Sequence, residues 1–301
     1  MQVGLIGANF KTADLALREK FALALTILQK QNFSFPLVVI STCNRAEVYF
    51  SAGDLSHAKR EILLFLPSEI APHLYSYFGL DCFIHLARVC AGLDSAIWME
   101  SEIRRQVKLS YLKTKFKSKD LHYLFQKSFR AAKKIRNSFA SGASSLERMI
   151  WKLSKEMWEG SYLFVGYSKT NRLIHSYLQR KGITNLTFAS RTSFKNSIGW
   201  DDPSKFFDYD VIIVASAHDE YILKKHHYDL SSKKSSMIFD LSLPRLVDLE
   251  LSFLKLINID QLQDKTSKKP DVGAEVVLKE HVTRLYDLFE RKGALKELAV
   301  L

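Results

Sequence analysis

Along roughly the first 80 residues of the chain, segments with the hydrophobic pattern of a β-strand alternate with segments that have the pattern of an α-helix. Apolar runs at residues 2–9, 35–40 and 48–50 are rich in β-branched and aromatic side chains, which favour β-strands. A helix between the first two runs is indicated by apolar residues at helical spacing, namely Leu17, Phe21, Leu25 and Leu28. A second helix at 54–66 and a strand at 73–77 complete the order β-α-β-β-α-β. This order predicts a ferredoxin-like α+β sandwich.

Residues 82–139 have a helical pattern with a strongly basic character. Between Arg104 and Arg136 there are twelve Lys or Arg residues and one acidic residue, so most of the formal net charge of +12 lies there. One face of the last predicted helix is apolar, and the other carries Lys127, Arg130 and Lys134. Such a stripe suits contacts with the phosphates of a polyanion. The alternative is a solvated helix face whose lysines keep the protein soluble.

The second half of the chain alternates short buried strands with helices. The strands are predicted at residues 162–166, 186–189, 211–215, 237–239 and 256–259. Strands joined by crossover helices form a parallel, doubly wound sheet of the Rossmann type, and the class is therefore α/β. Polar stretches after both predicted domains indicate linkers. We predict an N-terminal domain at 1–145, a Rossmann-type domain at 146–265, and a linker with a C-terminal helix at 266–301.

Composition narrows the class of protein further. The chain has 301 residues, of which 47% are hydrophobic and 25% charged, as expected for a soluble globular protein. No apolar run is long enough for a membrane span, and no secretory signal is present. Three cysteines without a CxxC pair argue against a disulfide scaffold and a metal site. These features predict a cytoplasmic protein.

The candidate chemistry lies in the polar turn at residues 41–47, between two predicted strands. It contains Cys43 two positions before Arg45. A fixed positive charge lowers the pKa of a nearby thiol, and the thiolate is the nucleophilic form. The alternative is a small apolar cysteine beside a surface ion pair between Arg45 and Glu47.

The residues around this turn resemble the active-site signature of the glutamyl-tRNA reductases. Residues 41–49 read Ser-Thr-Cys-Asn-Arg-Ala-Glu-Val-Tyr. Three further blocks are similar to the family in the same order, at residues 10–20, 85–108 and 124–130. The resemblance covers most of the chain, from about residue 3 to about residue 290. It implies the first committed reaction of five-carbon tetrapyrrole (porphyrin and haem) biosynthesis.

The resemblance also implies roles for individual residues. The Cys43 thiolate would attack the glutamyl ester of the tRNA, and the resulting thioester would be reduced to glutamate-1-semialdehyde. Arg45 would clamp a substrate carboxylate. His85 would orient groups or move a proton, although a histidine on an apolar helix is often a core residue. Further substrate-binding residues would be Thr42, Asn44, Ser95, Glu100 and Gln106. The basic stripe of Lys127, Arg130 and Lys134 would then bind tRNA.

The glycine-rich loop after the first Rossmann strand is degenerate. A dinucleotide fingerprint reads G-x-G-x-x-G, because glycines let the backbone approach the pyrophosphate at a helix N-terminus. This chain keeps Gly166 but has Ser168 and Asn171 at the other two positions, with Lys169 as a compensating charge. The alternatives are nucleotide binding by these residues and a Rossmann domain without a cofactor.

The end of the next strand indicates which cofactor the resemblance implies. Ser190, Arg191 and Thr192 stand where the family binds NADPH. No acidic residue occupies the position that would bind the ribose of NAD, and Arg191 can pair with a 2′-phosphate. These residues favour NADPH.

The C-terminal region departs from the family. Family members usually continue past the long connecting helix into a helical dimerisation domain, whereas this chain ends at Leu301. The homodimer of the family is therefore in doubt. The expected partners are glutamyl-tRNA and a downstream aminomutase for the semialdehyde. The alternatives are a non-reducing relative that binds tRNA or a pathway partner, and a dehydrogenase that acts on a free small molecule.

Overall fold

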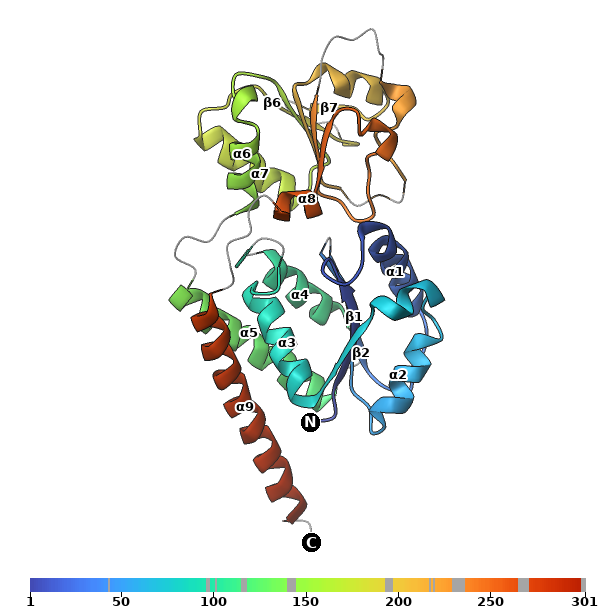
Figure 1. Cartoon of the computed structure of the whole chain (residues 1–301), viewed down its shortest axis with the longest axis vertical. Helices are drawn as coiled ribbons and strands as arrows, with labels where there is room; N and C mark the ends of the chain where they lie inside the picture. The colour runs from blue at the N-terminus through green and yellow to red at the C-terminus, as the bar shows by residue number, and fades with distance from the viewer. Residues whose placement is uncertain are drawn as a thin grey trace. The chain divides into compact units, whose positions relative to one another are not determined.

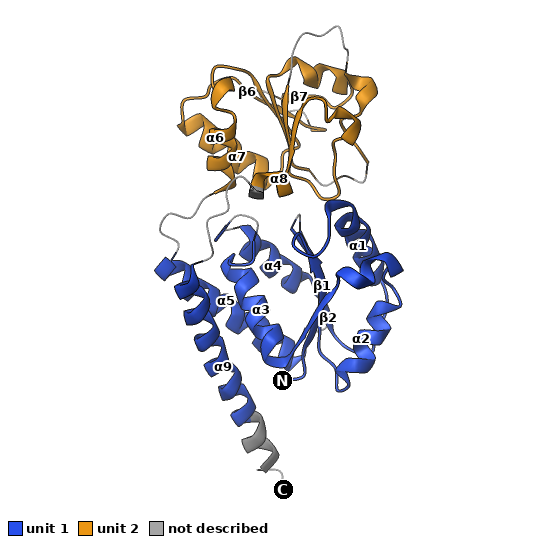
Figure 2. Cartoon of the chain, viewed as in Figure 1, with its two compact units in different colours: residues 1–143, 267–301 blue, residues 144–266 orange. Residues whose placement is uncertain are grey.

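The computed structural model forms two compact units. It describes residues 1–42, 44–95, 98–100, 102–114, 118–139, 145–192, 197–216, 218, 220–228, 236–264 and 271–298, with side chains described up to residue 292. One unit comprises residues 1–143 and 267–301, and the other comprises residues 144–266 (Figure 2).

The first unit is built on a four-stranded antiparallel sheet. Its strands are β1 (Gly4–Asn9), β2 (Leu37–Thr42), β3 (Arg45–Phe50) and β4 (Tyr75–Phe78). The strand order β2-β3-β1-β4, with α1 (Leu15–Leu28) and α2 (Leu55–Leu63) as the connecting helices, is that of the predicted ferredoxin-like sandwich. The turn is shorter than predicted, because β3 already begins at Arg45 and pairs it with Thr42.

Side chains on alternate positions of this sheet enter two different cores. Ala46, Val48 and Phe50 of β3 pack with α1 and α2, whereas Tyr49 faces the opposite side. That side is covered by α3 (Gly79–Ala91), α4 (Glu102–Lys113) and α5 (Lys119–Phe139), as Figure 1 shows. The alternation explains how one strand can carry both an apolar face and a face with polar residues.

The long C-terminal helix α9 (Val272–Leu298) belongs to this unit and packs on α3 and α5. Ala274, Leu278 and Val282 are fully buried in the shared core. A salt bridge joins Arg88 Nε of α3 to Glu275 Oε2 at 2.9 Å. Tyr123 of α5 also donates a hydrogen bond to the carbonyl oxygen of Leu285, at 2.8 Å.

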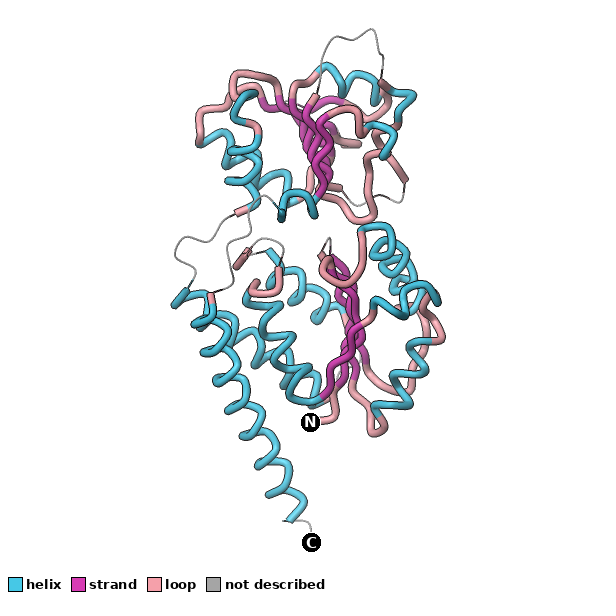
Figure 3. Tube along the Cα trace, in the orientation of Figure 1, coloured by secondary structure: helices cyan, strands magenta, loops and turns pink. Residues whose placement is uncertain are grey.

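The second unit contains a six-stranded parallel sheet (Figure 3). Its strands are β5 (Tyr162–Val165), β6 (Leu186–Ala189), β7 (Ser197–Ile198), β8 (Val211–Val214), β9 (Met237–Asp240) and β10 (Lys255–Asn258). The order β10-β9-β8-β5-β6-β7 is that of a Rossmann fold, as predicted. Only the two-residue strand β7 was not predicted, because so short a strand has no hydrophobic period.

The remaining helices connect or flank these strands. The α-helices of the second unit are α6 (Leu146–Leu153), α7 (Lys169–Arg180) and α8 (Ile259–Asp264). Short 3-10 helices span Ser68–His73, Lys155–Met157, Pro203–Asp208, Lys225–His227 and Leu249–Leu251. Among the helices that the structure describes, none combines the length and the apolar character needed to cross a membrane.

The packing of α9 predicts that it contributes to the stability of the first unit. Leu278→Ala removes a fully buried side chain and should lower the free energy of unfolding by about 2–5 kcal/mol. Leu288→Ala, on the same helix but half exposed, should change it by less than about 0.5 kcal/mol. Urea unfolding followed by circular dichroism measures both variants, and equal effects would contradict the role given to α9.

Candidate active site

A buried carboxylate at Glu47 organises the centre of the first unit. Glu47 lies on β3, opposite Gly7 of β1, which in turn lies opposite Tyr75 of β4. A Cβ atom at Gly7 would come within 2.7 Å of Glu47 Cγ, so only glycine leaves room for the carboxylate here. The hydroxyl of Tyr75 reaches across Gly7 and donates to Glu47 Oε1 at 2.7 Å. Tyr49 donates to Oε2 at 2.8 Å.

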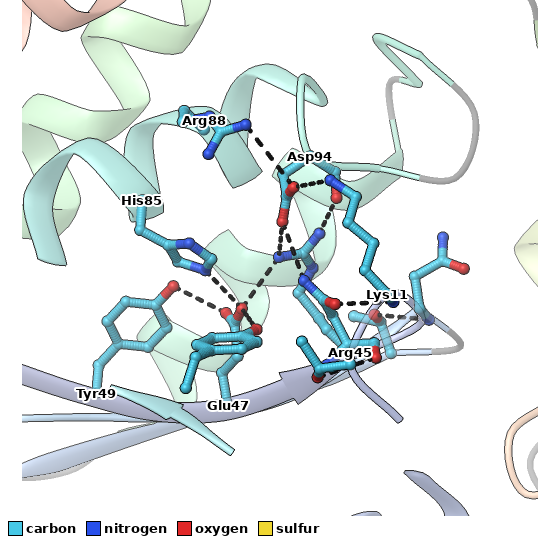
Figure 4. Close-up of polar contacts among 12 residues, drawn as sticks. Lys11, Arg45, Glu47, Tyr49, His85, Arg88 and Asp94 are labelled. Atoms are coloured by element: carbon cyan, nitrogen blue, oxygen red, sulfur yellow. Dashed lines mark hydrogen bonds and ion pairs between the residues drawn. The ribbon is translucent and has the colours of Figure 1, made fainter. Parts of the chain in front are cut away.

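Helix α3 and the loop after it supply His85 and Asp94 to this site, and Arg45 comes from β3 (Figure 4). Nε2 of His85 lies 2.8 Å from Glu47 Oε1. Nη1 of Arg45 lies 3.0 Å from the same oxygen and 3.2 Å from Asp94 Oδ2, while Nη2 donates to the backbone oxygen of Asp94. Asp94 also forms an ion pair with the ammonium group of Lys11. The network thus connects β3, which follows the Cys43 turn, to β4, to α3 and to the loop after α3.

His85 is held on more than one side. Its ring stacks on Tyr77 at a centroid distance of 5.0 Å and lies 5.3 Å from the ring of Tyr75. It is 5% exposed, yet it is hydrogen-bonded to a carboxylate rather than surrounded by apolar side chains alone. Its packing is that of a histidine with a defined orientation.

The charges in this network stabilise one another. Burial opposes the charge on Glu47, but the cation of Arg45 and the contact with His85 outweigh it and lower the pKa of Glu47. The pKa of Asp94 is lowered in the same way, by Arg45 against the effect of burial. Burial also opposes the charge on Arg45, yet the two carboxylates raise its pKa. Both carboxylates are therefore ionised at neutral pH.

The nucleophile predicted from the sequence, Cys43, lies outside the described residues. Thr42 and Asn44 on either side of it are buried, with Thr42 Oγ1 accepting the backbone N–H of Asn44 at 3.3 Å. The backbone oxygen of Asn44 accepts the N–H of Phe10 at 3.0 Å. These contacts hold both ends of the turn on the sheet.

The other predicted substrate-binding residues lie on the loop after α3 and on α4. Ser95 and Glu100 are partly exposed on that loop, and Gln106 is partly exposed on α4. Burial raises the pKa of Glu100 to about 7, in spite of the nearby charge of Arg45. A carboxyl group that changes its charge near neutral pH therefore lies close to Arg45.

Arg45 is placed differently from both sequence-based interpretations. It is fully buried, so its ion pair with Glu47 is not the surface ion pair that the alternative interpretation of the sequence expected. Both terminal nitrogens are bonded to Glu47 and Asp94, whereas the buried Nε has no hydrogen-bond partner among the described residues. A substrate carboxylate could bind the two terminal nitrogens together only by replacing these oxygens. The sequence did not predict the contact of Asp94 with Arg45 or that of Tyr49 with Glu47. For Tyr49 there was a signal, because Arg45, Glu47 and Tyr49 place polar groups at every second position of β3.

In the second unit, the degenerate glycine loop has a well-defined conformation. Gly166 has a φ of +94°, and a Cβ atom there would lie 2.8 Å from Ser216 Cβ. Ser168 caps α7 by accepting the backbone N–H of Asn171 at 3.1 Å. Asn171 is fully buried and points toward the sheet, donating to the backbone oxygens of Val165 and Gly166 at 2.9 and 2.8 Å. Its side chain therefore does not fill the space outside the loop.

The other predicted cofactor residues and the basic stripe are at the protein surface or near it. Lys169 is partly exposed at the start of α7. Ser190 is buried after β6 and accepts the N–H of Thr192, while Arg191 is exposed and lies over the ring of Trp200 at 5.1 Å. On α5, Arg130 and Lys134 are exposed and Lys127 is partly exposed.

Comparison with known proteins identifies the family. Residues 6–139 match the family model described as glutamyl-tRNAGlu reductase, N-terminal domain, and residues 203–265 match shikimate/quinate 5-dehydrogenase. A glutamyl-tRNA reductase of Chlamydia abortus is 29% identical, over 98% of this chain and 95% of that protein. One of Chlamydia trachomatis serovar A is 30% identical, over 88% of this chain and 84% of that protein. The chain belongs to the glutamyl-tRNA reductase family.

Other members of the glutamyl-tRNA reductase family differ in length. The protein from Neisseria meningitidis serogroup B is 29% identical, over 94% of this chain but 79% of that protein. The solved glutamyl-tRNA reductase from Methanopyrus kandleri has the same fold, with a TM-score of 0.54 and 20% identity over 99% of this chain and 83% of that chain. The predicted family and the predicted fold class are thus confirmed.

The network around Glu47 predicts a strong effect of neutralising this carboxylate. Glu47→Gln removes the carboxylate that contacts His85 and one of the two carboxylates that contact Arg45, and it should lower the free energy of unfolding by about 3–5 kcal/mol at neutral pH. Glu280→Gln, at an exposed position of α9, should change it by less than about 0.5 kcal/mol. Tyr49→Phe removes one hydrogen bond and should cost about 1 kcal/mol, which keeps the test valid if the first variant does not fold.

The lowered pKa of Glu47 also fixes the sign of the pH dependence. An ionised native carboxylate stabilises the fold above the unfolded pKa of about 4.3, and this contribution is lost as the pH falls toward the lower folded pKa. The difference in stability between wild type and Glu47→Gln should therefore shrink from about pH 5 downward. A constant difference over this range would contradict an ionised Glu47.

The glycine loop offers a matched pair of variants. Gly166→Ala and Gly182→Ala both place a side chain at a positive φ, +94° and +90°, but only the first meets neighbouring atoms within 4 Å. Gly182→Ala should cost about 1 kcal/mol, and Gly166→Ala about 1–3 kcal/mol more. Thermal and urea unfolding measure the two costs, and equal values would show that Gly166 is required only for its φ.

Proposed function

We propose that this protein is an NADPH-dependent glutamyl-tRNA reductase that forms a thioester at Cys43. The observation that carries the proposal is the family relationship along nearly the whole chain, with the signature Ser-Thr-Cys-Asn-Arg at residues 41–45. The buried network of Arg45, Glu47 and His85 supports it, because it fixes the strand that begins two residues after Cys43.

In the first step, the sulfur of Cys43 bonds to the α-carbonyl carbon of the glutamyl ester, and the carbon–oxygen bond to the tRNA breaks. The released ribose oxygen takes up a proton, and His85 is our candidate to transfer it. Because Glu47 is ionised, Nε2 of His85 must carry a hydrogen toward it. The lone pair of the neutral ring is then at Nδ1, which is the atom that can accept and return a proton.

We assign Arg45 a positioning role in place of the predicted clamp. Its guanidinium joins β3 to Asp94 in the loop after α3, and the same loop carries Ser95. The candidates for binding the glutamyl group remain Thr42, Asn44, Ser95, Glu100 and Gln106. Among them, Glu100 can change its charge near pH 7, which makes it sensitive to a bound ammonium or carboxylate.

The second unit supports binding of NADPH. Gly166 has the positive φ at which glycine is favoured, and the N-terminus of α7 offers amides suited to a pyrophosphate. Arg191 is exposed and suits a 2′-phosphate. When bound, NADPH supplies the hydride that converts the thioester to the aldehyde and frees the thiolate. Because the product is an α-amino aldehyde, a downstream aminomutase is the expected consumer.

Replacement of the nucleophile tests the proposal. Cys43→Ser should lower the formation of semialdehyde from glutamyl-tRNA and NADPH by at least about 10³-fold, because a serine hydroxyl is a far weaker nucleophile without a general base. Cys90→Ala is the matched control: Cys90 is buried, and burial raises the pKa of its thiol, so the variant should retain most activity.

Assay of both products separates the proposal from its alternative. Aldehyde that depends on Cys43 and NADPH supports a reductase, whereas release of free glutamate without aldehyde would indicate a thioester that only water resolves. If the wild-type protein forms neither product in a complete assay, the reductase proposal is wrong.

A further inference from the structure

Helices α5 and α9 line a strongly cationic pocket, and none of its described lining residues belongs to the Glu47 network. It has a volume of about 420 Å³. Four cationic side chains line it, three from α5 and one from α9: Lys119, Lys127, Arg130 and Lys292. No acidic side chain is among its lining residues in the part of the chain that the structure describes. A pocket with this charge attracts an anion with several negative groups.

Two aromatic rings position the lysines of this pocket. The ammonium group of Lys127 lies 5.3 Å from the ring centre of Tyr123, and that of Lys119 lies 5.5 Å from the ring centre of Phe289. The two rings contact each other, with centroids 4.6 Å apart. The rings of Tyr123 and Phe289 are therefore in contact with lysine ammonium groups. For this reason we expect the pocket to contact a ligand mainly through its charges.

The acidic residues next to the pocket are occupied by other groups. Asp120 follows Lys119 in the sequence, but its Oδ2 accepts the backbone N–H of Gln2 at 2.6 Å. Glu290 follows Phe289 and pairs with the amino group of Met1. Glu290 is thus paired with a cation, whereas the hydrogen bond from Gln2 leaves the charge of Asp120 in place. Neither carboxylate is among the lining residues of the pocket.

The positive charge continues along the two helices beyond the pocket. His281 of α9 lies close enough to Lys134 of α5 and to Arg284 for these charges, together with burial, to lower its pKa. Lys134 and Arg284 thus place further positive charge on the same two helices that line the pocket. Cations spread along two helices suit an extended polyanion better than a single small anion.

We propose that this pocket binds backbone phosphates of the tRNA substrate, so that α9 shares with α5 the contact to RNA. The inference rests on the proposed function only in naming tRNA as the RNA. Because lysine and arginine contacts to phosphates carry no base readout, this contact adds affinity without selecting a sequence. Lys119 and Lys292 are its new members beyond the stripe predicted on α5.

The salt dependence of binding tests the proposal directly. In this experiment, unacylated tRNA is titrated with the full chain at several salt concentrations, and the binding constant K is measured by fluorescence anisotropy. The quantity compared between variants is the slope of log K against log salt concentration. Each lost phosphate contact reduces the magnitude of this negative slope by about 0.7–0.9. The double variant Lys119→Gln/Lys292→Gln should therefore lower it by about 1.4–1.8, and by the same amount with a tRNA for another amino acid.

A matched double variant removes the same charge elsewhere. Lys108 and Lys113 are exposed on α4 and do not line the pocket, so Lys108→Gln/Lys113→Gln should leave the slope within about 0.5 of wild type. An equal loss in both double variants would overturn the proposal in favour of diffuse attraction to the whole basic segment. An unchanged slope in Lys119→Gln/Lys292→Gln would overturn it as well.

The role of the rings has a separate signature. Phe289→Leu keeps all charges but removes the ring under Lys119, so it should weaken tRNA binding about two- to fivefold with the salt slope unchanged. A loss of about tenfold or more would instead indicate stacking of a base on Phe289 and would overturn the purely electrostatic contact.

These measurements distinguish this inference from the proposed function. They use unacylated tRNA and no cofactor, so they do not depend on thioester formation or reduction. An active reductase whose double variant binds tRNA like wild type would refute the pocket alone. An inactive wild type whose tRNA binding depends on Lys119 and Lys292 would refute the reductase alone.

Discussion

The first unit depends on a single buried anion, the carboxylate of Glu47. An ionised group removed from water costs several kcal/mol unless its partners replace the lost hydration. Here, the two oxygens of Glu47 are contacted by four side chains, those of Arg45, Tyr75 and His85 at Oε1 and that of Tyr49 at Oε2. They come from three separate elements, β3, β4 and α3, so the carboxylate stabilises the fold only when these elements are assembled. This requirement links the position of the Cys43 turn to the packing of α3 on the sheet.

Such an arrangement favours specificity of structure over net stability. Replacing a buried ion pair by apolar residues of similar size is often neutral or stabilising, whereas removing one partner is strongly destabilising. An apolar residue in place of Glu47 would still fill the space between β3 and α3. It would not orient the ring of His85 or the guanidinium of Arg45, and both orientations are needed in the proposed reaction. The ion pairs therefore serve the geometry of the site.

The sequence was sufficient to predict most strands and helices, because nearly all have a clear hydrophobic period. The limits of the turn were not predictable in this way. Arg45 and Glu47 are charged and resemble turn residues, but they occupy strand positions whose side chains face the core. A charged residue can take such a position only beside a compensating charge, and Asp94 lies 49 positions away in the sequence. Likewise, the docking of α9 depends on Arg88, Tyr123 and a shared core, which no local pattern reveals.

The glycine loop shows why a departure from a motif can preserve its geometry. The third glycine of a dinucleotide fingerprint allows close packing between helix and strand. Asn171 at this position is larger, but its amide group donates to the backbone oxygens at the end of β5. The hydrogen bonds thus replace close contact as the link between α7 and the sheet. The second glycine is replaced by Ser168, whose hydroxyl caps α7 by accepting the backbone N–H of Asn171. The first position has no such substitute, since its φ and the nearby Ser216 exclude a side chain, and there the chain has kept glycine.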